Sequence, residues 1–345
     1  MSDPPTAPTE SPFVTLAIPC LNEESFIDRT VRGALGQDYP PDRLEVLVAD
    51  GGSTDRTRAI LAEIARQDGR LRVIDNPDRI QAAGMNAMIR RAHGAVVIRL
   101  DAHAEYAHDY VRRCVEVMAR TGADNVGGAQ RARATTWFQR VFCAAMTSPL
   151  GGGGAGYKSP TAEGFVDTVY CGAFRRSVFE TVGMFDAHAV TNEDAELNQR
   201  IAAAGGHVYL SRDIVAHYYP RTGFAAVARQ YFAYGKGRAR TVLKHRRFLT
   251  PRPLASLGAV LGGALLLATW PLNHIAPPVF AFYAFVCAVE AIRAGVRCGV
   301  WAIPAIWALF PVMHASHGAG MIWGFVHYWR HPDWQEPERL TPAAT

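Results

Sequence analysis

The sequence has few cysteines, and their placement excludes the sites that cysteines usually build. Its six cysteines are scattered between Cys20 and Cys298, with no C-x-x-C pair and no spacing that binds zinc. This pattern excludes a disulfide framework. It favours reduced, mostly buried thiols in a cytoplasmic domain.

The N-terminal segment lacks the features of a signal peptide. Residues 1–12 are rich in Pro, Thr, Ser and acidic residues, without a basic start followed by an apolar core. We expect a disordered leader there. The chain also has no evident internal repeat.

Charged residues become rare after Arg252, and this divides the chain in two. Before that point, apolar and charged segments alternate as in a soluble α/β protein. Residues 254–272 then carry no charge, and as a helix they would span about 28 Å, enough for a bilayer core. Two more apolar stretches follow, at 277–292 and 300–326. We therefore predict a membrane region at 254–328 with about three helices, followed by a tail at 329–345.

A dense basic cluster precedes the apolar region. A solvated helix face and a nucleic-acid contact are its other interpretations, but its position favours a cytoplasmic juxtamembrane segment at 236–253. Arg293 and Arg297 lie between the second and third apolar stretches, so the positive-inside rule places the catalytic domain in the cytoplasm. The prediction is a multi-pass protein of a bacterial-type inner membrane that does not bind nucleic acid. The cluster consists of Lys236, Arg238, Arg240, Lys244, Arg246, Arg247 and Arg252.

The most informative stretch is LEVLVADGGSTDRT, at residues 44–57. Its apolar, β-branched start predicts a buried parallel strand that ends on Asp50, and its Gly-Gly-Ser turn leads into a helix that reaches about Gln67. It matches neither G-x-G-x-x-G nor G-x-x-x-x-G-K-[ST], because its first positioned side chain is acidic. A carboxylate at the end of a parallel strand accepts hydrogen bonds from a base or a ribose. The stretch therefore indicates a nucleotide held by its nucleoside end.

Strands and helices alternate around this stretch. We predict strands at 14–18 (ended by Pro19), 71–74 and 95–100, and helices at 23–35 and 82–92, the last one amphipathic. This order predicts βαβ units and a parallel sheet with one ligand-binding edge. The Gly-rich run at 151–156 is interpreted as a mobile loop over the site or as a plain connector.

Three acidic motifs occur in a defined order. Asp50 is the first, Asp101-Ala102-His103 the second, and Glu193-Asp194 the third, at the start of a predicted helix whose positions 195, 197 and 201 face inward. With the opening P-x-x-N-E (Pro19 to Glu23) and the R-R-x-x-F-x-x-V-G-x-F-D run (175–186), they resemble the family 2 glycosyltransferases over residues 13 to about 244. The closest resemblance is to membrane-attached glucosyltransferases of succinoglycan-type exopolysaccharide synthesis. This resemblance implies an α/β catalytic domain of GT-A fold, placed here at 13–235.

Sugar transfer from a nucleoside diphosphate requires neutralisation of the leaving diphosphate and a base for the acceptor hydroxyl. The resemblance implies Asp101 as ligand of a divalent cation, Mn²⁺ or Mg²⁺, although His103 replaces the second aspartate of the usual D-x-D. His103 is interpreted as a direct ligand, which suits Mn²⁺, as a group behind the ligand, as a sugar contact, or as a satisfied histidine after a strand. Asp194 is implied as the general base beside Glu193, and helix capping is the alternative.

The nucleotide is expected to contact residues near the strand ends. Asp50 is the candidate for the uracil ring or the ribose, in a pocket with Pro19, Asn22 and Glu23. Arg79 either neutralises the diphosphate, stacks on the base or is a surface residue. Asn86 either positions the metal site or stabilises its own helix start.

The segment 230–237 keeps only the Gln of the Q-x-x-R-W motif that processive relatives carry. Gln230, Tyr234 and Lys236 are therefore expected to contact the acceptor or the diphosphate, on a helix that also suits a membrane interface. The predicted function is an inverting, non-processive transfer of a sugar, glucose in our interpretation, from a UDP-sugar to a polyprenyl-diphosphate-linked glycan, alongside other polysaccharide-assembly proteins. A nucleotide-sugar-binding assembly protein with a degenerate site is the alternative. A transporter is disfavoured, because the apolar segments contain few polar groups.

Overall fold

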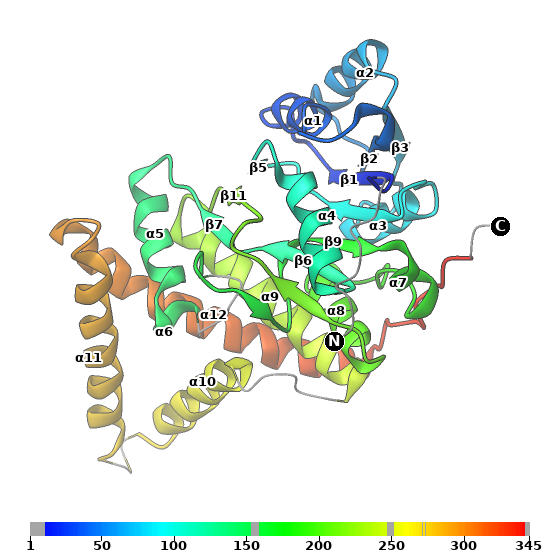
Figure 1. Ribbon diagram of the computed structural model, residues 1–345. Coiled ribbons are helices and arrows are strands. Elements are labelled where there is room, and N and C mark those ends of the chain that lie inside the picture. Colours follow the sequence, from blue (N-terminus) through cyan, green and yellow to red (C-terminus); the bar gives the residue numbers. More distant parts are fainter. Residues whose placement is uncertain (1–10, 153–158, 247–251, 271, 273, 342–345) are drawn as a thin grey trace, which may run out of the picture. The chain divides into compact units, whose positions relative to one another are not determined.

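The computed structural model describes residues 11–152, 159–246, 252–270, 272 and 274–341. The chain forms two compact units. The first unit comprises residues 1–131, 159–218 and 335–345, and the second comprises residues 132–158 and 219–334. Figure 1 labels the elements of both units.

The first unit is built on a mixed eight-stranded sheet with the order β3-β2-β1-β4-β9-β6-β10-β8. Strands β3, β2, β1 and β4 are parallel, as predicted, whereas β9 runs antiparallel to both β4 and β6. Strands β6 and β10 are parallel as well, so the predicted, mostly parallel sheet is confirmed, with β9 and β8 as its antiparallel strands. The strands are β1 (Val14–Cys20), β2 (Leu44–Asp50), β3 (Leu71–Asp75), β4 (Val96–Arg99), β6 (Asn125–Gly128), β8 (Gly164–Phe165), β9 (Tyr170–Arg175) and β10 (Val208–Leu210).

A smaller sheet has the order β5-β11-β7 and lies in the chain after the second acidic motif. Its β5 pairs antiparallel with β11 and begins one residue after His103. The strand therefore fixes the backbone that follows Asp101. The strands are β5 (Ala104–Tyr106), β7 (Gln130–Ala132) and β11 (Ala216–Tyr218).

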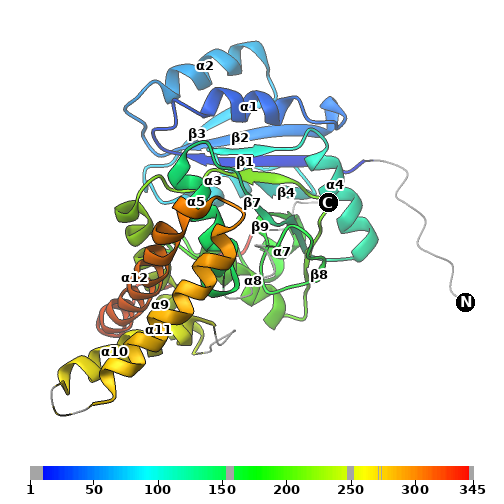
Figure 2. The ribbon, with the colours of Figure 1, turned by 90° about the vertical axis from the view of Figure 1, so that its left-hand side faces the viewer.

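Helices cover both faces of the parallel half of the main sheet. Figure 2 shows α1 and α2 on one face and α3 on the other. The predicted amphipathic helix at 82–92 is wrong in one respect, because α3 is buried on nearly all sides: a Cβ on Gly84 would lie 3.2 Å from the Cβ of Ala49. The helical elements are α1 (Ile27–Leu35), η1 (Pro41–Arg43), α2 (Thr57–Gln67), α3 (Gln81–Ile89), α4 (Tyr110–Thr121), α7 (Arg176–Thr181) and α8 (Glu193–Ala203).

Two predicted element boundaries differ from the structure. Strand β1 continues through Pro19 to Cys20, because its pairing with β4 ends at Ala17 and no hydrogen bond on that side requires the amide that proline lacks. Helix α2 begins at Thr57, where the N–H donates to Oδ1 of Asp55. Asp55 thus accepts a hydrogen bond from one of the otherwise unpaired amides at the helix start.

The predicted tail belongs in part to the first unit. The N–H of Met184 donates to the carbonyl of Glu338 at 2.8 Å, and that of Leu340 to the carbonyl of Phe179 at 3.0 Å. The carboxylate of Glu338 also pairs with Arg90. Residues 338–340 therefore lie beside α7 and the end of α3, whereas Trp329 and Arg330 belong to α12.

The second unit is helical, and its helices α9 and α12 lie side by side (Figure 1). Glycines allow this close approach: a Cβ on Gly235 would lie 2.0 Å from the carbonyl oxygen of His317, and one on Gly320 would lie 2.1 Å from that of Phe232. The helical elements are α5 (Trp137–Thr147), α6 (Pro149–Gly152), α9 (Phe224–His245), α10 (Arg252–Ala268), α11 (Ala276–Gly295), η3 (Val300–Ala302) and α12 (Ile303–Arg330).

The prediction of three membrane helices is not supported. Among the described residues, only Ala276–Gly295 is long and apolar enough to cross a membrane, and the apolar stretch Leu254–Ala268 is shorter. The 17 residues of α10 would span about 26 Å, less than a bilayer core. The third predicted segment lies largely in α12, whose glycines pack against α9 and α10.

Two other predictions differ from the structure. Arg240, in the predicted juxtamembrane cluster, is buried and pairs with Asp333, so the cluster is not a uniformly solvated surface. The predicted domain boundary between residues 235 and 236 falls inside α9. Most of the Gly-rich run, residues 153–156, lies outside the described residues, as does Arg247.

Candidate active site

The parallel strands carry the predicted acidic residues to one edge of the first unit. The register aligns Cys20 with Asp50 and Asp50 with Asp75, so the carboxyl ends of β1, β2 and β3 are level. Asp101 follows β4, whose Arg99 aligns with Ala17 of β1. Open α/β sheets bind their ligands at this edge.

Arg99 joins the second and third acidic motifs. Its Nη1 donates to Oε1 of Glu193 at 2.8 Å, while its Nη2 and Nε approach Oδ1 of Asp101 at 3.2 and 3.3 Å. The Arg99 side chain is only 11% exposed. Arg99 is not among the site residues predicted from the sequence, although its charge inside the apolar strand AVVIRL is a signal, because a buried charge requires partners.

Other contacts hold Asp101 from both sides. Nε2 of Gln81, at the start of α3, donates to Oδ1 of Asp101 at 3.4 Å, and the Asp101 N–H donates to the hydroxyl of Tyr106 at 2.6 Å. Although burial opposes ionisation, the charge of Arg99 holds the pKa of Asp101 below its usual value. Asp101 is therefore an ionised carboxylate in a fixed position.

Glu193 and Asp194 have different environments at the start of α8. Glu193 is buried, and this burial, with the nearby charge of Asp194, raises its pKa to about 7, even though Arg99 favours the ionised form. Asp194 is partly exposed, and its Oδ1 accepts the N–H of Ala195 at 2.7 Å. Asn192 precedes them in a left-handed conformation with φ of 70° and makes no side-chain cap. Asp194 is thus the more accessible of the two acids.

His103 contacts the loop that follows β1. Its Nδ1 lies 3.1 Å from Oε1 of Glu23. Because an ionised carboxylate only accepts hydrogen bonds, Nδ1 carries the proton and Nε2 carries the lone pair in neutral His103. Histidines that bind metals are oriented by this kind of carboxylate contact.

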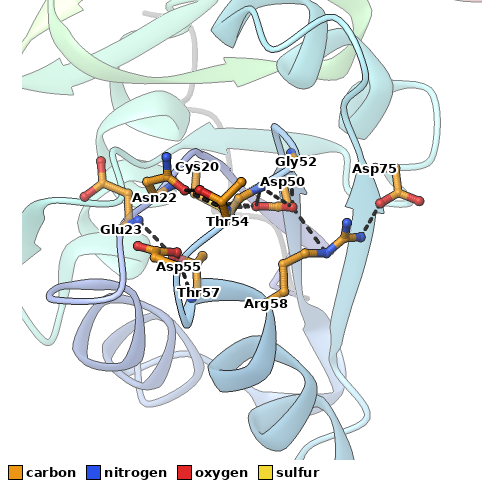
Figure 3. A network of polar contacts seen from close by, with 11 residues as sticks. Cys20, Asn22, Glu23, Asp50, Gly52, Thr54, Asp55, Thr57, Arg58 and Asp75 are labelled. Carbon is orange, nitrogen blue, oxygen red and sulfur yellow. Dashed lines mark hydrogen bonds and ion pairs between the residues drawn. The ribbon is translucent and has the colours of Figure 1, made fainter.

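The loops after β1 and β2 are joined by a polar network (Figure 3). Asp50 is fully buried, and its carboxylate accepts the N–H groups of Gly52 and Ser53 at 3.1–3.3 Å and contacts Nε of Arg58 at 3.4 Å. Across the loops, the Thr54 N–H donates to Oδ1 of Asn22 at 2.8 Å. The predicted nucleoside residues Asn22, Glu23 and Asp50 are therefore close together, and Asp50 shapes its own turn.

The structure places the remaining predicted nucleotide residues differently. Pro19 lies in β1 beside this network, and Arg79 follows β3 in a left-handed conformation with φ of 58°. Asn86 is buried, and its amide group both donates to and accepts from the backbone of Phe185, at 2.8 and 2.9 Å. Asn86 therefore connects α3 to the segment before α8, rather than stabilising its own helix start.

Comparisons with known proteins agree with this geometry. Residues 15–183 match the model of the family described as glycosyl transferase family 2. The chain is 36% identical over 260 residues to the succinoglycan biosynthesis protein ExoA of Rhizobium meliloti, covering 74% of this chain and 78% of that protein.

The chain is a family 2 glycosyltransferase.

A second relative of this glycosyltransferase is a Methanococcus voltae enzyme, named as a glucuronosyltransferase that acts on a dolichyl N-acetylglucosaminyl phosphate. It is 27% identical over 241 residues, covering 67% of this chain and 74% of that protein. The mannosyltransferase PcManGT of Pyrobaculum calidifontis, solved with GDP-mannose and Mn²⁺, has a TM-score of 0.67 at 22% identity, over 92% of this chain and 88% of that one. The predicted GT-A-like catalytic fold is confirmed.

The site of this glycosyltransferase fits a divalent cation that is shared with a substrate. Among the residues that the structure describes, no three His, Cys, Asp or Glu side chains are grouped to hold a metal. Mg²⁺-type sites often use one or two protein ligands together with substrate phosphates. The fixed carboxylate of Asp101 matches that pattern, and the oriented imidazole of His103 suits Mn²⁺ better than Mg²⁺.

The predicted acceptor residues of the glycosyltransferase lie in the second unit, on α9. Nε2 of Gln230 donates to the hydroxyl of Tyr234 at 2.7 Å. Nζ of Lys236 lies 4.4 Å from the ring centroid of Trp323, in a cation–π contact within that unit.

Proposed function

We propose that this glycosyltransferase moves a hexose from a UDP-sugar, glucose in our interpretation, to a polyprenyl-diphosphate-linked glycan, with inversion at the anomeric carbon. The observation that carries the proposal is the arrangement of Asp101, Arg99 and the Glu193-Asp194 pair at one edge of the sheet. It supplies an oriented carboxylate for the donor side and an accessible carboxylate for the acceptor side.

In the proposed step, the carboxylate of Asp194 takes the proton of the acceptor hydroxyl. The acceptor oxygen forms a bond to the anomeric carbon, and the bond from that carbon to the diphosphate breaks. The leaving UDP keeps the electron pair. A cation held by Asp101 and His103 would neutralise charge on the diphosphate.

A single displacement is favoured by the state of Glu193. Retention through a covalent intermediate requires a second carboxylate that is available as a nucleophile. Glu193 is buried and paired with Arg99 at 2.8 Å, so it is poorly placed to attack. One accessible carboxylate supports inversion.

The nucleoside end is proposed to bind at the Asp50 network, with Pro19, Asn22, Glu23 and Arg79. This is the edge where parallel sheets bind nucleotides, and the Asp50 turn is already held by its own amides. Asn86 is not assigned to the nucleotide, because its amide contacts Phe185.

The acceptor side is proposed to involve Gln230, Tyr234 and Lys236 on α9, with α11 inserted in the membrane. Helix α11 has 20 residues and is apolar apart from the paired Glu290 and Arg293, and Phe282, Phe285 and Val296 are exposed on it or at its end. A lipid-linked acceptor would be presented at that membrane surface. The two relatives named for succinoglycan and for a dolichyl-linked sugar support this acceptor class.

The experiment is a donor screen with the full chain in membranes that contain lipid-linked glycans. We expect divalent-cation-dependent release of UDP from one UDP-sugar, and inverted anomeric configuration in the product by NMR. Asp194→Asn is the inactive control. Retained configuration would overturn the proposed displacement, and UDP binding without turnover on any acceptor would favour the assembly-protein alternative.

A further inference from the structure

Arg99 is a buried cation placed between two acidic motifs, and its partner Glu193 lies 94 positions further along the sequence. Its guanidinium reaches Asp101 at the end of β4 and Glu193 at the start of α8. Asp101 is 13% exposed and Glu193 is 6% exposed, so solvent screens these ion pairs only weakly.

A second arginine in the same unit provides a comparison. Arg112, on α4, contacts three carboxylates, those of Asp38, Asp109 and Glu116, at 2.8 to 3.5 Å, whereas Arg99 contacts two. Its side chain is 37% exposed, and its partners are also partly exposed. Exposed pairs of this kind contribute little, whereas a buried arginine depends on its partners.

We infer that Arg99 is a positioning residue that couples the cation side of the site, at Asp101, to the base side, at Glu193 and Asp194. The inference rests on the proposed function, because it takes Asp101 as the cation ligand. One guanidinium presents several donors in a fixed fork, so a change at one carboxylate alters its contact with the other.

The coupling has a direction that can be measured. When Glu193 pairs with Arg99, the guanidinium is shared and Asp101 keeps part of its charge for a cation. When Glu193 is neutral, Arg99 turns to Asp101 and competes with the cation. Because coupling between sites is reciprocal, a bound cation at Asp101 likewise strengthens the pairing of Arg99 with Glu193.

The test is a double-mutant cycle with Mn²⁺ affinity as its readout, measured on the full chain by electron paramagnetic resonance, with Mn²⁺ alone and then with UDP. We expect Glu193→Gln to weaken Mn²⁺ binding about fivefold or more when Arg99 is present. In the Arg99→Met background the same substitution should change the affinity less than twofold. Equal effects in both backgrounds would overturn the coupling.

Three controls make the outcome specific. Arg112→Met should leave Mn²⁺ affinity unchanged, which excludes a general charge effect. Arg99→Lys keeps the charge without the fork, so it should also reduce the coupling, and it replaces Arg99→Met in the cycle if that variant does not fold. Arg99→Lys should lower kcat while KM for the donor stays within twofold of the parent value. A purely structural role of Arg99 would instead lower the amount of folded enzyme, without lowering kcat relative to KM.

The result also separates this inference from the proposed function. Failure of the parent chain to bind Mn²⁺ would overturn the cation role of Asp101 together with the coupling. Mn²⁺ binding with additive effects would overturn the coupling and leave the proposed function intact. Coupling without sugar transfer would support the inference about Arg99 and count against the proposed reaction.

Discussion

Asp50 and Asp101 both lie at the carboxyl ends of parallel strands, and their surroundings differ. The partners of Asp50 lie in or beside its own turn: the amides of Gly52 and Ser53, the Ser53 hydroxyl, the Cys20 thiol and Arg58. Those of Asp101 are side chains from three different elements, namely Arg99 of β4, Gln81 of α3 and Tyr106 of β5. The same residue type at the same topological position thus has two environments.

The difference is one of charge compensation. Backbone amides stabilise Asp50 wherever the turn is intact, so its carboxylate maintains a local conformation. Arg99 stabilises the charge of Asp101, and it belongs to the site itself. The comparison predicts that substitutions near Asp101 and Asp194 impair chemistry, and that substitutions near Asp50 impair the fold of the nucleoside loop.

The largest expected effect is that of Asp194→Asn. Removal of a general base lowers rates by about 10²–10⁴-fold, so kcat should fall about 1,000-fold in a UDP-release assay. Because Asp194 is partly exposed, the melting temperature should change little by circular dichroism. Asp38→Asn, at an exposed surface carboxylate, is the control. Near-normal turnover by Asp194→Asn would show that the base lies elsewhere.

Asp101→Asn is expected to have the second largest effect. Loss of one preorganised electrostatic group costs about 10²–10³-fold in rate, and we expect about 100-fold here together with weaker Mn²⁺ binding. Asp50→Asn is the matched variant, because it makes the same change at the other strand end. Equal loss of Mn²⁺ affinity in both variants would break the comparison.

The sequence predicts the parts of this comparison that depend on local pattern. The strand before Asp50, its Gly turn, the acid after β4 and the helix at Glu193 follow from apolar runs and turn residues, and residues 195, 197 and 201 are buried as predicted. The hydrogen bond from Arg99 to Glu193 joins residues that are 94 positions apart, so no local sequence pattern indicates this contact.

Long-range packing also explains the wrong predictions. The polar residues of helix α3 predict one face toward solvent. The helix is buried instead, and the side-chain amide of Asn86 donates a hydrogen bond to the carbonyl of Phe185. The antiparallel strand β9 depends on pairing with β4 and β6, which are distant in the sequence. The apolar helix α12 packs closely against α9 at Gly235 of α9 and Gly320 of α12, so its apolar residues do not by themselves indicate a membrane segment.

Asp50→Asn should affect stability more than the chemical step. Hydrogen bonds to a charged group are worth about 1.5–3 kcal/mol, and the amide would present N–H groups toward donors, so we expect a loss of about 2 kcal/mol in unfolding free energy. Urea denaturation of the full chain in detergent measures this, with Asp42→Asn, at an exposed position, as control. An unchanged denaturation midpoint would contradict the structural role of Asp50.

The pH dependence tests the Asp101 side by a smaller, graded effect. Burial raises the pKa of Glu193 to about 7, so below that pH the protonated carboxyl no longer pairs with Arg99 as an anion. Turnover should fall as the pH drops through 7 and level off at the activity of Glu193→Gln, which has the same neutral side chain. For stability the sign is opposite: the folded state binds this proton more tightly, so the contribution of Glu193 to unfolding free energy decreases as pH rises from 4.5 to 7. In Glu193→Gln the activity should not change with pH in this range. A fall in activity that remains near pH 7 in this variant would show that Glu193 is not the group that titrates.

The smallest expected effect is that of Arg58→Met. This variant tests how Arg58, which contacts Asp50, differs from Arg99, which contacts Asp101. Arg58 contacts Asp50 at 3.4 Å and also pairs with Asp75, but its side chain is 51% exposed, whereas Arg99 is 11% exposed. Exposed ion pairs contribute about 0–1 kcal/mol, and the amides of the turn already stabilise Asp50. Urea denaturation should therefore show a loss below about 1 kcal/mol, with kcat within twofold of the parent. A loss as large as that of Asp50→Asn would mean that Asp50, like Asp101, depends on its arginine rather than on its own turn.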